Sequence, residues 1–249
     1  MQLSYADRAK YLGDPDFVAV PVEGLLDKGY INSRAALITP FRAAGSYEAG
    51  TPPGAPKRTA ALPGEVSGTS HFVAADKAGN VASMTSTVEG VFGSQLAANG
   101  MVLNNELTDF TLAPEQDGAP VANRVEPGKR PLSSMSPTIV YGPDKKPLMA
   151  VGSAGGKRII MHVTKTLIGV LDFGLTPEQA VALPNLFYDK DGLVIESTPL
   201  GNWLAPQISA FGSKTRAGEL GSKLNVAYRT KGEWKGVADP RSQGNALAD

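Results

Sequence analysis

The sequence has 249 residues, which is enough for one substantial domain or two small ones with a buried core. Its 24 lysine and arginine residues balance 24 aspartate and glutamate residues, so the zero net charge gives no reason to expect a nucleic-acid partner. With no cysteine and two histidines, thiolate zinc sites are excluded and a histidine-rich metal centre is not expected. No segment reaches the roughly 18 apolar residues of a membrane span, and the sequence as given carries no export signal.

The segment 1–68 combines short helical patterns with a long stretch rich in glycine and proline. A helix is expected over 21–28, because a proline opens this segment and a glycine follows it. A second helix is expected over 33–38, ending before Pro40. From 43 to 68, glycines and prolines interrupt every periodic pattern, which predicts a linker.

The pattern changes at Thr69, where alternating strands separated by turn residues begin. Strands are expected over 70–75, 81–88, 101–103, 136–141 and 147–151, and a last hairpin over 225–229 and 233–237. Apolar residues at helical spacing predict a helix over 157–172. A capping threonine followed by proline predicts another over 176–183. Strands with helices packed on them indicate the α+β class.

Several common catalytic motifs are absent from the sequence or lack a required residue. The segment 152–157 resembles a phosphate loop, but the Walker pattern needs glycine at Val151 and serine or threonine at Arg158. No G-x-S-x-G elbow and no S-x-x-K motif is present. The histidines, His71 and His162, are not spaced as a helical pair of metal ligands. A nucleophile in this chain is therefore expected to use a base other than histidine.

The junction between Gly68 and Thr69 lies between the predicted linker and the first predicted strand. A self-cleaving precursor needs its scissile bond at such a place, accessible on one side and held rigidly on the other. Cleavage would free the Thr69 α-amine, whose ordinary pKa of about 8 lets it act as the general base for its own hydroxyl. Gly68 admits the strained backbone that the rearrangement passes through. Taken alone, a Gly–Thr pair at a strand start is ordinary, so a purely structural interpretation stays open.

Four sequence blocks follow one another downstream of this junction, at 69–80, 103–110, 129–139 and 152–159, with Asp-Pro-Arg at 239–241 and two further blocks upstream, at 5–8 and 11–17. In order and spacing they resemble the γ-glutamyltransferase (γ-glutamyltranspeptidase) family of N-terminal-nucleophile hydrolases. The resemblance covers nearly the whole chain. It implies a four-layer αββα sandwich, with residues 1–68 as the end of a large subunit plus linker and 69–249 as the small catalytic subunit.

The resemblance also implies roles for individual residues. Thr69 corresponds to the nucleophile and Thr87 to the threonine that supports it. Gly155 and Gly156 correspond to the oxyanion-hole glycines, at the start of a predicted helix. Without the resemblance, these glycines would be interpreted as a simple turn before a helix. Glu106 and Asp109 would likewise be interpreted as part of a solvated acidic turn. The residues implied to contact the substrate are Glu106 and Asp109 at its α-ammonium, Ser133 and Ser134 at its α-carboxylate, and Glu89 at a position that contributes to the substrate site.

Two departures from the family pattern bear on function. Position 89 is glutamate where the best-known transpeptidases have asparagine, and the extra charge could alter which acyl group is accepted. Only the short segment 1–68 precedes Thr69, whereas the family has a large subunit several times longer that includes an arginine for the substrate carboxylate. The sandwich is therefore expected to be incomplete, which exposes sheet edges and apolar faces to a missing large-subunit chain.

The leading hypothesis is a γ-glutamyltransferase or glutathione hydrolase that cleaves itself before Thr69. It would transfer the γ-glutamyl group of a substrate such as glutathione to water, an amino acid or a dipeptide, with no metal or organic cofactor. A second hypothesis is a related β-lactam side-chain (glutaryl) acylase, and a third is an unprocessed, inactive fragment. The resemblance further implies a periplasmic or secreted location.

Overall fold

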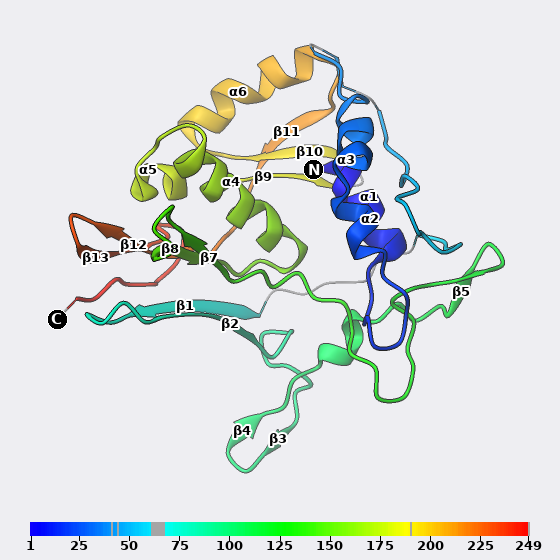
Figure 1. Cartoon of the computed structure of the whole chain (residues 1–249), viewed down its shortest axis with the longest axis horizontal. Coiled ribbons are helices and arrows are strands. Elements are labelled where there is room, and N and C mark those ends of the chain that lie inside the picture. The colour runs from blue at the N-terminus through cyan, green and yellow to red at the C-terminus, as the bar shows by residue number, and fades with distance from the viewer. Residues whose placement is uncertain (41, 44, 61–67, 190, 249) are drawn as a thin grey trace.

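The computed structural model describes residues 1–40, 42–43, 45–60, 68–189 and 191–248, which form a mixed α+β fold (Figure 1). Its helices are α1 (Gln2–Tyr11), α2 (Val22–Leu26), α3 (Lys28–Ala35), α4 (Ile159–Leu171), α5 (Pro177–Ala182) and α6 (Pro199–Ala210), with 3-10 turns η1 (Glu106–Asp109) and η2 (Gly156–Arg158). The longer strands are β1 (Thr69–Ala75), β2 (Val81–Thr87), β7 (Thr138–Tyr141), β8 (Pro147–Gly152), β9 (Leu186–Asp189), β10 (Gly192–Glu196), β11 (Thr215–Gly218), β12 (Asn225–Thr230) and β13 (Glu233–Ala238). Two-residue strands form two short arms: β3 (Ala97–Ala98) with β4 (Met101–Val102), and β5 (Glu115–Gln116) with β6 (Ala119–Pro120).

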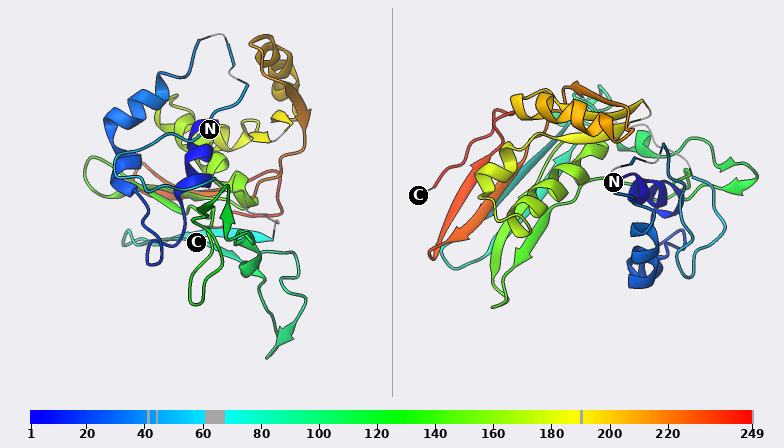
Figure 2. Two further views of the ribbon diagram at one scale, coloured as in Figure 1. Left: turned by 90° about the vertical axis from the view of Figure 1, so that its right-hand side faces the viewer. Right: turned by 90° about the horizontal axis from the view of Figure 1, so that it is seen from above.

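The main core consists of three layers: the hairpin β1–β2, the sheet β13-β12-β8-β7, and the helices α4 and α5 (Figures 1 and 2). Alternation along β8 places successive side chains on opposite faces of its sheet. Met149 and Val151 pack against Ile159 of α4 in the largest buried cluster. Gly152 faces the hairpin, where a Cβ would lie 2.3 Å from the His71 ring. The sheet can therefore approach β1 closely only because residue 152 lacks a side chain.

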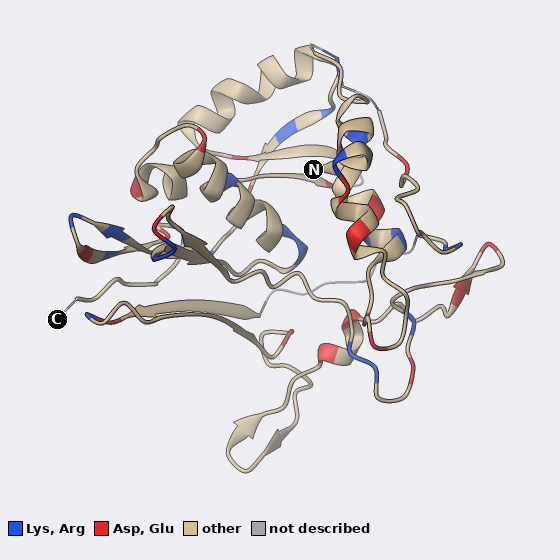
Figure 3. Cartoon of the chain, viewed as in Figure 1, with Lys and Arg blue, Asp and Glu red and all other residues tan. Residues whose placement is uncertain are grey.

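The hairpin β1–β2 is held in register along its whole length, with Thr69 opposite Thr87 at its open end. At its closed end, the backbone N–H of Asn80 donates to Asp76 Oδ1 at 2.8 Å. The two strands carry no charged side chain (Figure 3). On the hairpin face turned away from the four-stranded sheet, Phe72 and Met84 lie opposite each other and are 51% and 50% exposed.

A second sheet, β11-β10-β9, completes the fold beside α6. β9 and β10 are antiparallel, whereas α6 connects β10 to the parallel strand β11. Thr198 caps α6, because its hydroxyl accepts from the Gly201 N–H at 3.0 Å. Phe187 and Val194 form the small core of this sheet with Leu220.

The N-terminal helix α1 and the turn after it are fixed to the rest of the chain by contacts between residues far apart in the sequence. The Tyr5 ring packs edge-on against Phe187, with the ring centroids 5.5 Å apart. After the helix, Asp14 accepts two hydrogen bonds from the Arg130 guanidinium at 2.8 and 3.0 Å. These bonds hold the pKa of the Asp14 carboxyl well below its usual range.

The α+β class is confirmed, and the predicted strands and helices after residue 69 are present with small shifts in their bounds. The helix predicted over 33–38 is wrong, because the structure has α3 over Lys28–Ala35. The Asp27 side chain accepts from the Tyr30 N–H at 2.8 Å and starts this helix, so Gly29 lies within its first turn instead of ending a helix. The described residues of the predicted linker, 43, 45–60 and 68, contain no helix or longer strand. Residues 44 and 61–67 lie outside the described residues.

None of the helices in the described part of the chain has the length and apolarity that crossing a lipid bilayer requires.

Candidate active site

Thr69 is the first residue of β1, and its side chain is almost completely buried. Its hydroxyl donates to the Thr87 hydroxyl at 3.1 Å, across the antiparallel pair. The Thr87 hydroxyl also accepts from the Glu89 N–H at 2.8 Å. The Thr87 hydroxyl therefore holds the side chain of the candidate nucleophile, and the Glu89 N–H orients that hydroxyl.

The position before the nucleophile has no room for a side chain. A Cβ at Gly68 would lie 2.4 Å from the Glu89 carbonyl oxygen and 2.6 Å from that of Gly90. Both are backbone atoms, so a substitution there would displace the chain that carries Glu89. The close approach explains glycine at this position in terms of packing, in addition to backbone freedom.

Three carboxylates converge next to Thr69, because η1 brings Glu106 and Asp109 toward Glu89. Carboxylate oxygens of the three residues all lie within 4.8 Å of one another. Glu89 and Asp109 are each 5% exposed. Burial raises the pKa of Glu106, and the neighbouring Glu89 carboxylate adds to this effect. Together the three carboxylates offer one oxygen ligand each to a cation.

The backbone around these carboxylates is constrained. Glu89 has a φ of 69°, in the left-handed region that few residues other than glycine adopt. The next N–H, of Gly90, donates to Asn105 Oδ1 at 2.7 Å, and the Asn105 N–H donates to the Val88 carbonyl at 3.1 Å. These bonds tie the end of β2 to the segment before η1, so the local strain at Glu89 is compensated by its neighbours.

Ser133 and Ser134 lie at the same pocket as Thr69 and the carboxylates, with Met135 and Ile159 completing its lining. The Ser134 hydroxyl accepts from an Arg8 guanidinium nitrogen at 2.7 Å. Arg8 belongs to α1, so this contact joins two residues that are 126 positions apart in the sequence. Sequence reasoning did not assign Arg8 to the site, although it lies in one of the upstream blocks.

Gly155 and Gly156 form the turn that enters η2 and α4. Their φ angles of 134° and 56° lie in the region that favours glycine. Gly156 lines the pocket with Thr69, whereas Gly155 lines a separate cavity beside Ser70. The turn leads through η2 into the 13-residue helix α4, and there the Arg158 N–H donates to the Gly155 carbonyl at 3.2 Å and the Ile159 N–H to the Gly156 carbonyl.

Both histidines are buried supports. The His71 Nδ1 lies 2.9 Å from the Thr85 hydroxyl, and burial lowers the pKa of the ring to about 4. The His162 Nδ1 lies 3.2 Å from both the Ser153 hydroxyl and the Ala154 carbonyl, and burial lowers its pKa to about 4 as well. Both rings are therefore neutral at neutral pH.

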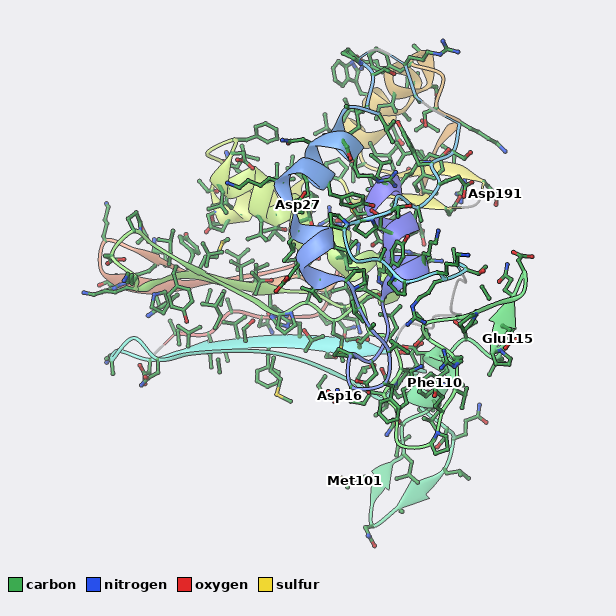
Figure 4. All side chains as sticks on the ribbon, turned by 45° about the vertical axis from the view of Figure 1, so that its right-hand side comes forward. Asp16, Asp27, Met101, Phe110, Glu115 and Asp191 are labelled. Atoms are coloured by element: carbon green, nitrogen blue, oxygen red, sulfur yellow. The ribbon has the colours of Figure 1, made fainter. Side chains whose placement is uncertain are left out.

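The structure brings nearly all the predicted site residues to one pocket, although they come from separate elements. The pocket is lined by Thr69, Thr87, Glu89, Glu106, Asp109, Ser133, Ser134 and Gly156. Figure 4 shows the two short arms, with Met101 in one and Glu115 in the other, and Phe110 near their base. Phe110 is 3% exposed and directly follows η1, so it anchors the acidic turn.

The chain is similar to several known proteins. The glutathione hydrolase proenzyme of Bacillus subtilis (strain 168) is 38% identical over 99% of the chain and 43% of its own length. The acylase ACY 1 proenzyme of Pseudomonas sp. (strain SE83) is 31% identical over 100% of the chain and 42% of its own length. The structure of γ-glutamyltranspeptidase from Pseudomonas nitroreducens in complex with L-DON matches with a TM-score of 0.63 and 32% identity, over 72% of this chain and 98% of that one.

The chain thus spans less than half the length of these curated relatives. The model of the family described as Gamma-glutamyltranspeptidase matches residues 1–249. A match over the whole chain, together with a relative of 38% identity, shows that the chain belongs to the γ-glutamyltranspeptidase family.

Proposed function

We propose that Thr69 is the nucleophile of a γ-glutamyltransferase or glutathione hydrolase and that it becomes active when the Gly68–Thr69 bond is cleaved. The observation that supports this most is the position of the Thr69 hydroxyl, 3.1 Å from the Thr87 hydroxyl, at a pocket with acidic residues and serines. In the first reaction, Thr69 Oγ1 attacks the Gly68 carbonyl carbon and the C–N bond breaks. Water then hydrolyses the resulting ester, leaving a Gly68 carboxylate and a free Thr69 α-amine.

The catalytic cycle uses the same atoms. The free α-amine takes the proton of the Thr69 hydroxyl, and Oγ1 attacks the γ-carbonyl carbon of the substrate. The N–H groups of Gly155 and Gly156 stabilise the oxyanion, a contribution of about 10²–10³ in rate for one well-placed donor. The proton passes to the leaving amine as the C–N bond breaks. Water or the amine of an amino acid or peptide then takes the γ-glutamyl group from the threonine ester.

The acidic residues favour a γ-glutamyl group over a glutaryl group. A γ-glutamyl donor carries an α-ammonium, and Glu89, Glu106 and Asp109 concentrate negative charge where this group would lie. A glutaryl group lacks that ammonium, so it would displace water from the charged site without the attraction that offsets this desolvation. Glu89 was the reason to consider an acylase, but its position beside two other carboxylates supports the γ-glutamyl specificity.

The substrate preference can be measured directly on the purified protein. We expect turnover of a γ-glutamyl anilide at least tenfold faster, in kcat/KM, than turnover of the matching glutaryl anilide. Mass spectrometry of the same sample should show two pieces separated after Gly68. Faster glutaryl turnover would favour the acylase hypothesis, and one intact, inactive chain would favour the silent fragment.

Arg8 is expected to act on the substrate carboxylate through Ser134, to which it donates at 2.7 Å. We expect Arg8→Met to raise KM for a γ-glutamyl anilide about tenfold with a smaller change in kcat, because a misplaced hydroxyl weakens substrate binding more than chemistry. The control is Lys10→Met, which removes a positive charge from the same helix. The Lys10 ammonium lies over the Tyr11 ring, 5.5 Å from its centroid. An unchanged KM in Arg8→Met would exclude this role.

The wider architecture follows from the same proposal. Residues 1–68 would be the end of a large subunit and residues 69–249 the small catalytic subunit. A complete four-layer αββα sandwich would need a further layer outside β1–β2, where Phe72 and Met84 are half-exposed, and a large-subunit chain would supply it. The bacterial relatives support a periplasmic or secreted location.

A further inference from the structure

Two side chains at the start of β12 hold the backbone of the nucleophile strand. The Lys223 ammonium donates to the Thr69 carbonyl at 3.2 Å, and Asn225 Nδ2 donates to the His71 carbonyl at 2.7 Å. The donors are two residues apart, and so are the acceptors, which places both carbonyls on the same side of β1. The start of β1, which carries the nucleophile, is therefore fixed by side chains of a neighbouring sheet.

The backbone that carries Lys223 is itself fixed on both sides. The Ser222 hydroxyl donates to Asp239 Oδ2, and the Leu224 N–H donates to the same oxygen at 3.0 Å. Ser222, Leu224 and Asp239 are all buried, whereas Lys223 is exposed. The Lys223 side chain thus extends from a buried, hydrogen-bonded backbone segment toward Thr69.

We propose that Lys223 is a positioning residue for Thr69, and that its positive charge keeps the Thr69 α-amine unprotonated near neutral pH after the cleavage. This inference rests on the proposed function, in which that amine is the general base. The amine and the carbonyl belong to the same residue, so the ammonium and the amine nitrogen are on the order of 6 Å apart. A positive charge at this distance disfavours the protonated amine and frees the lone pair that the mechanism needs.

The charges around Thr69 are of opposite sign on its two sides. On the pocket side, Glu89, Glu106 and Asp109 stabilise an ammonium and would raise the pKa of the amine above its ordinary value of about 8. On the other side, Lys223, Arg158 and Arg241 line a cavity of about 580 Å³ together with His71, which is neutral. Arg241 is paired with Glu196 and Asp239. Another nearby cation, Lys157, lies over the Phe187 ring, 5.8 Å from its centroid.

The test is the pH dependence of kcat/KM for a γ-glutamyl anilide, measured on the cleaved, full protein that contains residues 1–249. Lys223→Met removes the charge and the donor, Lys223→Gln removes the charge but keeps a donor, and Lys223→Arg keeps both. We expect the acidic limb of the profile to move upward by about one pH unit in Lys223→Met and Lys223→Gln at low ionic strength, and to stay in place in Lys223→Arg. Added salt should shift the wild-type limb in the same direction, because it screens the exposed Lys223 more strongly than the buried Glu89 and Asp109.

Lys77→Met is the matched control, because Lys77 is an exposed lysine at the closed end of the same hairpin. Its profile should coincide with that of the wild type. An unmoved acidic limb in both charge-removing variants, with any loss of activity uniform over pH, would overturn the inference. A folded Lys223→Gln protein that stays uncut would also overturn it, since Lys223 would then act before the amine exists. Activity that survives in Thr69→Ala would instead refute the proposed function itself.

Discussion

Thr69→Ala should leave the protein as one chain of 26.0 kDa and abolish turnover of γ-glutamyl anilides. The wild type should instead yield two pieces, one ending at Gly68 and one beginning at Thr69. Alanine removes the hydroxyl that attacks Gly68 in processing and the substrate in catalysis, so both steps should fail together. Loss of a covalent nucleophile of this kind typically costs roughly 10⁴-fold or more in kcat. Intact-mass spectrometry and a colorimetric assay on the same sample measure the two effects.

Thr69→Ser is the control for this experiment, because it keeps the hydroxyl and removes only a methyl group. We expect it to be cleaved and active, at lower rates, since the methyl group restricts the side-chain rotamer. Circular dichroism should show the same fold for both variants, because neither changes the packing against the four-stranded sheet by more than one or two atoms. Cleavage of the alanine variant at Gly68 would assign the nucleophile to another residue.

Asp109→Asn should lower kcat/KM for a γ-glutamyl anilide about 100-fold, equivalent to about 2.7 kcal/mol. The substitution preserves the size of a 5% exposed side chain but removes one of three negative charges at the proposed ammonium site. A charge-assisted hydrogen bond is replaced by a neutral one at the point where the substrate is recognised. The matching glutaryl anilide has no ammonium to lose, so its slow turnover should change little.

The ratio of the two substrates therefore measures recognition separately from folding. Glu115→Gln, in the exposed arm strand β5, is the control and should leave the ratio unchanged. A parallel fall of both activities in Asp109→Asn would mean that Asp109 supports the structure of η1 instead of the ammonium. Thermal unfolding of each variant would show such a loss of structure directly.

Much of the fold was predictable from local patterns, since hairpins and capped helices are determined by neighbouring residues. Thr176 illustrates this: its capping box with Gln179 is present as the sequence predicts. The sheet β11-β10-β9 was not predicted, because its strands are short and carry no regular alternation. The helix α3 was misplaced because the cap at Asp27 outweighs the flexibility of Gly29.

The residues of the candidate site were predicted through the family resemblance. The contacts that support these residues were not predicted. Arg8 meets Ser134 across 126 residues of sequence, and Lys223 meets Thr69 across 154. No periodic pattern encodes contacts of this range, because they depend on how the layers pack against one another. The charge around Thr69 could therefore be assessed only in three dimensions.

The anchoring of α1 has a consequence for the cleaved protein. Before cleavage, the contacts of Tyr5 with Phe187 and of Asp14 with Arg130 are made within one molecule. After cleavage at Gly68 the same contacts join two separate polypeptides, and their association becomes bimolecular. Dilution, which has no effect on the uncut precursor, would then weaken the assembly and lower its unfolding temperature. The proposed self-cleavage would thus exchange a concentration-independent fold for a concentration-dependent complex of the pieces 1–68 and 69–249.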